Sequence, residues 1–313
     1  MARAMHPTAA RLRNGLRTRA FASTALVAAT VYLLWRSTTL GSGWTLLLSI
    51  PWFVAELWAF AQLAALSYKA WRLPEAPEAE AASIANRAAV DVLISATRAD
   101  QAEVERSLVG AASLRGRGRI VVVDTLARSE IRAVARSSGA AYVTDSRAAA
   151  SPGQAVHAHA RSELYLWLEA GQVPMPDLLV ELAPRFDRES LAVCQSAVGL
   201  LNADSLVHLR GGRDEEALLR NVIGPGLDRR GTAPWFGPAS LIRRSAVDAA
   251  GGFSTDDPAA VERLLVNMHC RGWASAFDAQ KLVRATARSA RSGSSRAAMR
   301  WSRMASPPRS MVC

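Results

Sequence analysis

Hydrophobic positions form two long runs near the amino terminus, followed by a regular succession of short runs. The first run covers Ala20–Trp35 and the second covers Trp44–Tyr68, with the polar turn Gly41–Gly43 between them. A helix needs about 20 residues to cross the hydrocarbon core of a bilayer. The second run meets this length, and the first meets it when residues 37–40 extend it. This pattern predicts a transmembrane helical hairpin.

Charges around the two runs indicate the orientation of the hairpin. Residues 1–19 carry arginines and no acid, and Lys69 and Arg72 follow the second run. The positive-inside rule then places both ends, and the remaining chain, in the cytoplasm. A cleaved signal peptide is the alternative for the first run, but Trp35 and Arg36 leave no small-residue cleavage site after it. We expect a multi-pass protein of the cell membrane.

An acidic residue, Glu56, interrupts the second run. An ionisable group inside a membrane span is costly, and this favours a packing or hydrogen-bonding role within the bundle. Gln62 or a backbone group is the partner that we expect.

After a Pro/Ala/Glu-rich linker, short apolar runs typical of buried strands alternate with segments that have the hydrophobic spacing of a helix. Buried strands are expected at residues 90–94, 119–124, 141–143, 164–168 and 191–195, and helices at 100–110, 129–138 and 177–182. In the first helix Val104, Leu108 and Val109 should face inward, and Ser129 should cap the second. Strands alternating with helices predict a parallel sheet in an α/β domain.

The basic composition points to a membrane surface. The chain has 313 residues and a net charge of +11. Such a balance suits nucleic acid or anionic lipid. Here the arginines gather before the first apolar run and in the C-terminal tail, so we expect membrane lipids as partners and no nucleic acid.

The segment Gly224–Phe253 is the most specific motif of the chain. It reads GPGLDRRGTAPWFGPASLIRRSAVDAAGGF. It resembles the acceptor side of membrane-bound family 2 glycosyltransferases of the cellulose-synthase-like group, where the run is roughly "pGlDrwGa…fccGtgallRReaLe…GGF". The resemblance places Trp235, Phe236 and Gly237 on the acceptor side, although Trp235 and Phe236 are also suited to a core.

The hydrophobic pattern, the charges and the resemblance together predict a domain organisation. It comprises a basic N-terminus and two transmembrane helices over residues 1–73, a linker over 74–88, and a basic, membrane-interfacial tail over 281–313. Residues 89–280 should form a GT-A-like (Rossmann-like), mostly parallel sheet domain.

Donor-site motifs of the family are only partly kept. Where the family has "DDG", Asp124 remains and Thr125 replaces the second acid. Asp124 suits a hydrogen bond from a base or ribose, or the capping of the following turn. Where the family has "DADHVP", with two carboxylates around Mg²⁺ or Mn²⁺, this chain keeps Glu169 and has Gly171 at the second position. One carboxylate can hold magnesium together with waters and phosphates, so a weak metal site and UDP-sugar binding are implied.

The family's base and diphosphate motifs are also altered. Counting back from Arg271–Trp273 places Ala259–Val261 at the "TED" motif, and a slip of one residue brings in Glu262 as the base. Asp257 is the other nearby acid, and it also suits the N-cap of the following helix.

In the "QxxRW" motif, Arg300 and Trp301 are kept and Ala297 replaces the glutamine. An arginine binds phosphate and an indole stacks on a sugar, or both belong to the interfacial tail.

These observations leave several functions open. The leading hypothesis is a membrane-anchored family 2 glycosyltransferase-like protein, weakly active or inactive, that transfers sugar from a nucleotide sugar to a polysaccharide or glycolipid. The alternative is a non-catalytic scaffold or regulatory subunit that joins other membrane subunits of an envelope polysaccharide assembly. An unrelated α/β domain on a membrane anchor is the third hypothesis.

Overall fold

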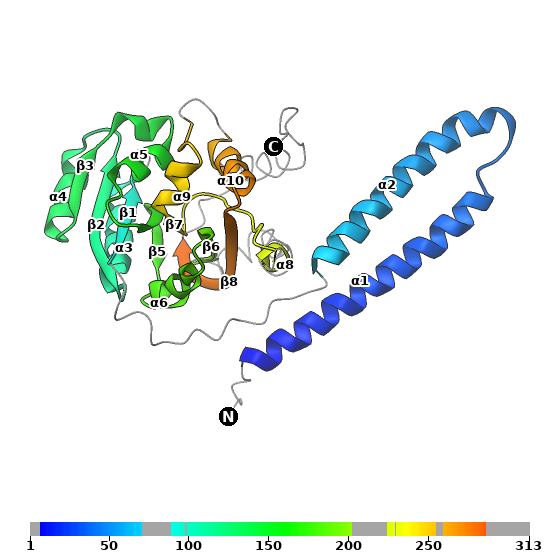
Figure 1. Ribbon diagram of the computed structural model, residues 1–313, viewed down its shortest axis with the longest axis horizontal. Coiled ribbons are helices and arrows are strands. Elements are labelled where there is room, and N and C mark those ends of the chain that lie inside the picture. Colours follow the sequence, from blue (N-terminus) through cyan, green and yellow to red (C-terminus); the bar gives the residue numbers. More distant parts are fainter. Residues whose placement is uncertain are drawn as a thin grey trace. The chain divides into compact units, whose positions relative to one another are not determined.

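The computed structural model describes residues 7–70, 89–97, 99–201, 224–228, 230–254 and 259–285 (Figure 1). The chain divides into two compact units. One comprises residues 1–76 with 216–230, and the other comprises 77–215 with 231–313. Several predicted positions lie outside the described residues, among them Asp257, Arg300 and Trp301.

The first unit is built on a helical hairpin. Helix α1 (Pro7–Thr38) and helix α2 (Leu46–Ala70) pack against each other, as Figure 1 shows, and the short helix α8 (Gly224–Asp228) belongs to the same unit. Gly41 and Gly43, in the turn between α1 and α2, have φ angles of +86° and +61°, which glycine adopts readily. The segments Arg19–Thr38 and Gly43–Ala65 are long and apolar enough to cross a membrane.

Glu56 has different partners from those predicted. Its Oε1 accepts hydrogen bonds from the Tyr32 hydroxyl and from Nε1 of Trp52, both at 2.8 Å. Nε of Arg36 lies 3.6 Å from its Oε2. The predicted hydrogen-bonding role is confirmed, but the partners are the Tyr32 and Trp52 side chains and not the predicted Gln62 or a backbone group, because the sequence pattern did not show which face of α1 meets α2.

The second unit contains an eight-stranded sheet in the order β3-β2-β1-β4-β7-β6-β8-β5. The strands are β1 (Val90–Ser95), β2 (Arg117–Asp124), β3 (Ala141–Thr144), β4 (Leu164–Glu169), β5 (Gln172–Pro174), β6 (Leu191–Leu200), β7 (Ser240–Arg243) and β8 (Ala274–Ala285). Strands β1 to β4 are mutually parallel, as predicted. The other half is mixed, since β7 runs antiparallel to β4 and β6, and β5 runs antiparallel to β8. The sheet is therefore mixed, with six of its eight strands running in the same direction, in keeping with the predicted mostly parallel sheet.

Helices cover both faces of the sheet. One face packs against α3 (Gln101–Ser113), α4 (Ser129–Ser137) and α6 (Leu178–Leu182). The other packs against α5 (Pro152–His159), α9 (Arg244–Ala249) and α10 (Ala260–Cys270). Strand β1 serves both cores, because Val92 and Ile94 face the first and Leu93 faces the second. This two-sided burial explains why the strand is apolar throughout.

Each predicted strand and helix is present, with three local corrections. Val104 and Leu108 are buried in α3, but Val109 is 73% exposed on its outer face. Ser129 is the first residue of α4, not its cap, and the backbone N–H of the N-cap Arg128 donates to Asp124. Strand β8 continues to Ala285, past the domain boundary predicted at residue 280. Strands β5, β7 and β8 and helices α5, α8 and α9 were not predicted.

Candidate functional site

Three polar residues lie at the carboxyl edge of the parallel half of the sheet. Asp124 and Glu169 were predicted as site residues, and Ser95 was not. Strands β1, β2 and β4 end at Ser95, Asp124 and Glu169. Ser95 is in register with Glu169 on one side and with Val123 of β2 on the other. The sheet order reverses between β1 and β4, and ligands of open α/β sheets bind in the crevice outside such a point. The two predicted donor-site acids therefore flank the expected crevice.

Asp124 is fully buried and its carboxylate is occupied by the protein's own donors. The Tyr142 hydroxyl donates to Oδ2 at 2.8 Å, and the backbone N–H of Arg128 donates to the same oxygen at 3.0 Å. Nη2 of Arg128 donates to Oδ1 at 2.7 Å. The backbone N–H of Leu126 donates to Oδ1 at 3.4 Å. Of the two roles predicted for Asp124, this geometry is that of the turn cap.

Arg128 joins Asp124 to the loop after β1. Its Nη1 donates to the Ala99 carbonyl at 2.5 Å, and its Nη2 donates to the Ala96 carbonyl. The guanidinium thus lies between the ends of β1 and β2. Burial disfavours the ionised carboxylate of Asp124, but the hydrogen bonds from Arg128 and Tyr142 outweigh it and hold the pKa of Asp124 below its ordinary value.

Glu169 differs from Asp124 in being exposed. It ends β4, and its backbone N–H donates to Oε1 of Gln172 at 2.9 Å across a tight turn. Gly171 in that turn has a φ of +96°, and a Cβ there would lie 3.7 Å from the side chain of Glu103 on α3. The turn therefore favours glycine at the position where a second carboxylate was expected.

These residues do not make a complete metal site. Glu169 is one exposed carboxylate, and the described parts of the chain hold no group of three or more His, Cys, Asp or Glu side chains arranged for a metal. Mg²⁺ is usually bound by one or two carboxylates together with waters and substrate phosphates. Glu169 alone does not fit a site formed by protein ligands only.

The predicted acceptor-side loop is packed against the core beneath the same edge. Trp235 is 2% exposed, and its Nε1 donates to the Ser240 hydroxyl at 3.0 Å. The backbone N–H of the half-buried Phe236 donates to Oε1 of Gln195 at 3.0 Å. Gly237 has a φ of +94°, and a Cβ there would meet the Trp167 ring at 3.3 Å. Of the two roles considered for Trp235, its position is that of a core residue, and the acceptor role of the loop stays a prediction.

The first turn of helix α10, which carries the candidate base Glu262, lies beside this loop. A Cβ on Gly237 would lie 3.7 Å from Cγ2 of Val261, so the first turn of α10 lies beside the loop. Glu262 follows Val261 in that turn and is half-buried. The other candidate, Asp257, lies outside the described residues, as do Arg300 and Trp301.

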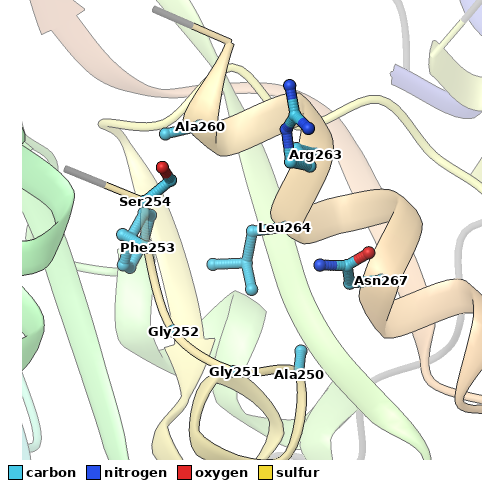
Figure 2. A pocket seen from close by; sticks show the side chains of 9 residues that line it. All are labelled: Ala250, Gly251, Gly252, Phe253, Ser254, Ala260, Arg263, Leu264 and Asn267. Atoms are coloured by element: carbon cyan, nitrogen blue, oxygen red, sulfur yellow. The ribbon is translucent and has the colours of Figure 1, made fainter. Parts of the chain in front are cut away.

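A pocket of about 250 Å³ opens between α10 and the segment Ala250–Ser254 (Figure 2). Leu264, Phe253 and the backbone of Gly251 and Gly252 form part of its lining. Arg263 and Asn267 of α10 and Ser254 across from them add polar groups. Hydroxyl, amide and guanidinium groups at the rim of a small pocket suit a polar ligand group.

Backbone strain is also located at this edge. Ala127 and Ala239 are the non-glycine residues with positive φ in the described part of the chain, at +55° and +64°. Ala127 precedes Arg128. Ala239 donates its N–H to the Trp167 carbonyl at 2.8 Å and accepts from the Ser196 N–H at 2.9 Å. Such strain persists only where the surrounding contacts enforce it, and it gathers at functional sites.

Sequence reasoning missed Arg128, Ser95 and Gln195. The spacing of Asp124 and Arg128, four residues apart with opposite charges, was the available signal for Arg128. Ser95 and Gln195 owe their positions to pairing between strands distant in sequence, for which the sequence of one chain offers no comparable signal.

Comparison with known proteins gives a sequence relative and structural neighbours. No family model matches the chain. The chain is 25% identical over 268 residues to Cellulose synthase 2 of Novacetimonas hansenii, a match that covers 80% of this chain but only 17% of that protein's length.

Among solved structures, the mannosyltransferase PcManGT from Pyrobaculum calidifontis, in complex with GDP-Man and Mn²⁺, has a TM-score of 0.52 and 13% identity. The alignment covers 88% of this chain and 69% of that one. Glucosyl-3-phosphoglycerate synthase from Mycobacterium tuberculosis, with Mn²⁺ and UDP-Glc, has a TM-score of 0.46 and 19% identity over 75% of this chain and 83% of that one. The likeness to PcManGT shows that the domain has a glycosyltransferase-like fold.

Proposed function

We propose that this protein is a membrane-anchored, family 2 glycosyltransferase-like protein of the cellulose-synthase-like group. It binds a nucleotide sugar at the carboxyl edge of β1, β2 and β4 and transfers the sugar slowly to a polysaccharide or glycolipid acceptor. The observation that carries the proposal is the exposed carboxylate of Glu169 at the β1–β4 reversal of the sheet. It is supported by the fold shared with PcManGT, whose structure holds GDP-Man and Mn²⁺.

Binding of the donor is weak in this proposal. Asp124 is saturated by internal donors, and Glu169 is the remaining predicted acid that faces solvent. A divalent cation would be held by Glu169 and by the diphosphate of the donor itself, so affinity depends only modestly on the metal. Arg300 and Trp301 keep their predicted roles toward the diphosphate and the sugar.

In this proposal the acceptor side is formed by Phe236 and Gly237, which follow the buried Trp235, and by the first turn of α10. In a transfer without a covalent intermediate, a carboxylate takes the proton of the acceptor hydroxyl as its oxygen attacks the anomeric carbon and the nucleoside diphosphate departs. Glu262 is the base in this proposal, because its turn of α10 lies beside Gly237. Asp257 is the second candidate.

The protein resides in the cell membrane in this proposal, with its second unit in the cytoplasm. The supporting facts are the two apolar helices, the arginines before them and the cellulose synthase relative. Membrane lipids and other membrane subunits are the proposed partners. A reporter active only outside the cytoplasm, fused after Cys313, should give no signal, and a signal would contradict this topology.

Nucleotide binding is the test of the proposed function. UDP, UDP-glucose and GDP-mannose are titrated into the full-length protein in detergent, with Mg²⁺, with Mn²⁺ and with a chelator. We expect weak binding that Glu169→Ala reduces further, whereas Glu105→Ala, an exposed acid on α3, leaves it unchanged. Absence of binding under all three conditions would refute the proposal.

The scaffold alternative has no observation of its own that favours it. The preserved fold and the exposed Glu169 are both accounted for by a slow transferase. The same titration separates the two hypotheses, because a scaffold has no requirement for Glu169.

A further inference from the structure

Arg128 lies between the ends of β1 and β2, beside the β1–β4 reversal at which a ligand of this edge is expected. Its guanidinium donates to Asp124 at the end of β2 and to the carbonyls of Ala96 and Ala99 in the loop after β1. The side chain is 19% exposed while that of Asp124 is 0% exposed. The cation therefore stands between solvent and the buried carboxylate.

The geometry of Asp124 leaves it little capacity for a ligand. A carboxylate offers two oxygens, and both here accept from internal donors. A ligand N–H group aimed at Asp124 must displace Arg128 before it can be accepted. The two carbonyls that Arg128 holds are withdrawn from a ligand in the same way.

The turn that carries Arg128 is under local strain. Ala127 has a φ of +55°, a conformation that alanine rarely adopts, and Leu126 beside it is 68% exposed. This turn directs both the backbone N–H and the guanidinium of Arg128 onto Asp124. A second tie joins the same two loops, since the Thr125 hydroxyl donates to the Thr97 carbonyl at 3.3 Å.

We infer that Arg128 is a latch that closes the Asp124 end of the nucleotide site, and that Asp124 accepts a ligand N–H only when the latch opens. With the latch closed, the crevice presents a cation and no free carboxylate at this end. The closed protein then discriminates poorly between nucleotides whose bases differ in their N–H donors. This inference rests on the proposed function, since it concerns the nucleotide of the same site.

The test compares Arg128→Lys and Arg128→Gln with the wild-type full-length protein in detergent. Lysine keeps a positive charge near Asp124 but has no planar fork with which to hold Asp124, Ala96 and Ala99 together. If Arg128→Gln fails to fold because Asp124 is left as a buried acid without a cation, Arg128→Lys is the variant on which the measurements are made. Ala127→Gly is the matched control, because it alters the same turn and leaves the guanidinium in place.

Two measurements are made on each variant: amide hydrogen exchange and titration with UDP and GDP. We expect faster exchange in the loop after β1 and at Leu126 in both Arg128 variants, and not in Ala127→Gly. We expect the affinity of Arg128→Gln for UDP to rise roughly tenfold, the effect of one additional hydrogen bond to a charged group. Its preference between UDP and GDP should change, while Ala127→Gly should bind as the wild type does.

The outcomes separate the latch from the proposed function. Faster exchange with unchanged UDP affinity would overturn the latch and leave nucleotide binding standing. Faster exchange with no nucleotide bound by any variant would overturn both, because the opened crevice would then not be a nucleotide site. Unchanged exchange in both Arg128 variants would also overturn the latch, since the guanidinium would not be what holds the two loops together.

Discussion

The hydroxyl of Tyr32 on α1 donates a hydrogen bond to Oε1 of Glu56 on α2 at 2.8 Å. The same oxygen accepts from Nε1 of Trp52, one turn earlier on α2. A carboxylate placed within an apolar hairpin is therefore held by donors from both helices, with Arg36 3.6 Å from its other oxygen. This contact fixes which faces of α1 and α2 meet.

Replacing Glu56 should weaken the hairpin in a manner that depends on the substituent. Glu56→Ala removes the shared acceptor and leaves the Tyr32 and Trp52 donors unpaired, at a cost of about 0.6–1.7 kcal/mol for an interhelical polar contact. Glu56→Gln keeps an acceptor oxygen and should cost less. Unfolding in mixed micelles, followed by circular dichroism, measures the difference. Gln62→Ala is the control, and equal effects of the Ala and Gln variants at position 56 would contradict the contact.

Ala127→Gly should leave the protein as stable as the wild type or more stable. Alanine in the left-handed region costs about 1–2 kcal/mol, which glycine avoids, although glycine has a larger entropy of the unfolded chain to lose. The matched control is Ala133→Gly, at an exposed position in the interior of α4, which should destabilise by about 1 kcal/mol. Chemical denaturation of the full-length protein measures both. Equal losses from the two substitutions would show that Ala127 is not strained.

Acid should destabilise the second unit partly through Asp145. Hydrogen bonds from the Arg147 side chain outweigh the effect of burial and, with the Arg147 N–H and His159, lower the pKa of Asp145 from 3.8 to about 2. A carboxyl group whose pKa is lower in the folded state contributes stability above its unfolded pKa. That contribution is lost as the pH falls through the window between 3.8 and about 2.

The pH prediction is tested with Asp145→Asn. The variant should be less stable than the wild type near neutral pH, and the difference should shrink below about pH 4 as the wild-type carboxyl group takes up its proton. Denaturation midpoints measured from about pH 7 to about pH 2 give the comparison. Asp177→Asn, at an exposed ion pair with Arg115, should have a small effect throughout. A constant difference between Asp145→Asn and wild type over the whole range would contradict the assignment.

Most of the parallel half of the fold was predictable because β1, β4 and the apolar part of β2 are buried. The runs at residues 90–94 and 119–124 were predicted as strands, and they lie within β1 (Val90–Ser95) and β2 (Arg117–Asp124). The antiparallel strand β7, Ser240–Arg243, was missed because only its two middle residues, Leu241 and Ile242, are apolar. Its place between β4 and β6 depends on contacts with segments distant in sequence.

The position of the candidate site was predictable from the sequence, but the hydrogen bonding and exposure of its two acids were not. The order of strands placed Asp124 and Glu169 at one edge of the sheet, and the structure brings them there. The sequence did not show that Arg128 would saturate Asp124, because that outcome requires the carbonyls of Ala96 and Ala99 at the end of a neighbouring strand. Asp124 is buried and Glu169 is exposed. This difference arises from tertiary packing, which the sequence pattern does not show.

Transfer activity should be slow and should depend on Glu262. Release of UDP or GDP from UDP-glucose, UDP-N-acetylglucosamine and GDP-mannose is measured in membranes that carry the protein, against membranes that lack it. Glu262→Gln keeps the shape of the side chain and removes its basicity, and should reduce the rate by about 10²–10⁴, the usual contribution of a positioned base. Glu105→Gln on α3 should leave the rate unchanged.

The location of Glu262 makes this test selective. It lies in the first turn of α10, one residue after Val261, whose side chain approaches the Gly237 position of the acceptor-side loop. An acid at the start of a helix is also stabilised by the helix dipole, so a structural role alone predicts that Glu262→Gln lowers stability without selectively lowering the rate. Rate and unfolding free energy are therefore measured on the same preparation. A rate lost in Asp257→Asn and kept in Glu262→Gln would transfer the role of base to Asp257. A rate kept in both variants would show that proton transfer to a carboxylate at this helix is not part of the reaction.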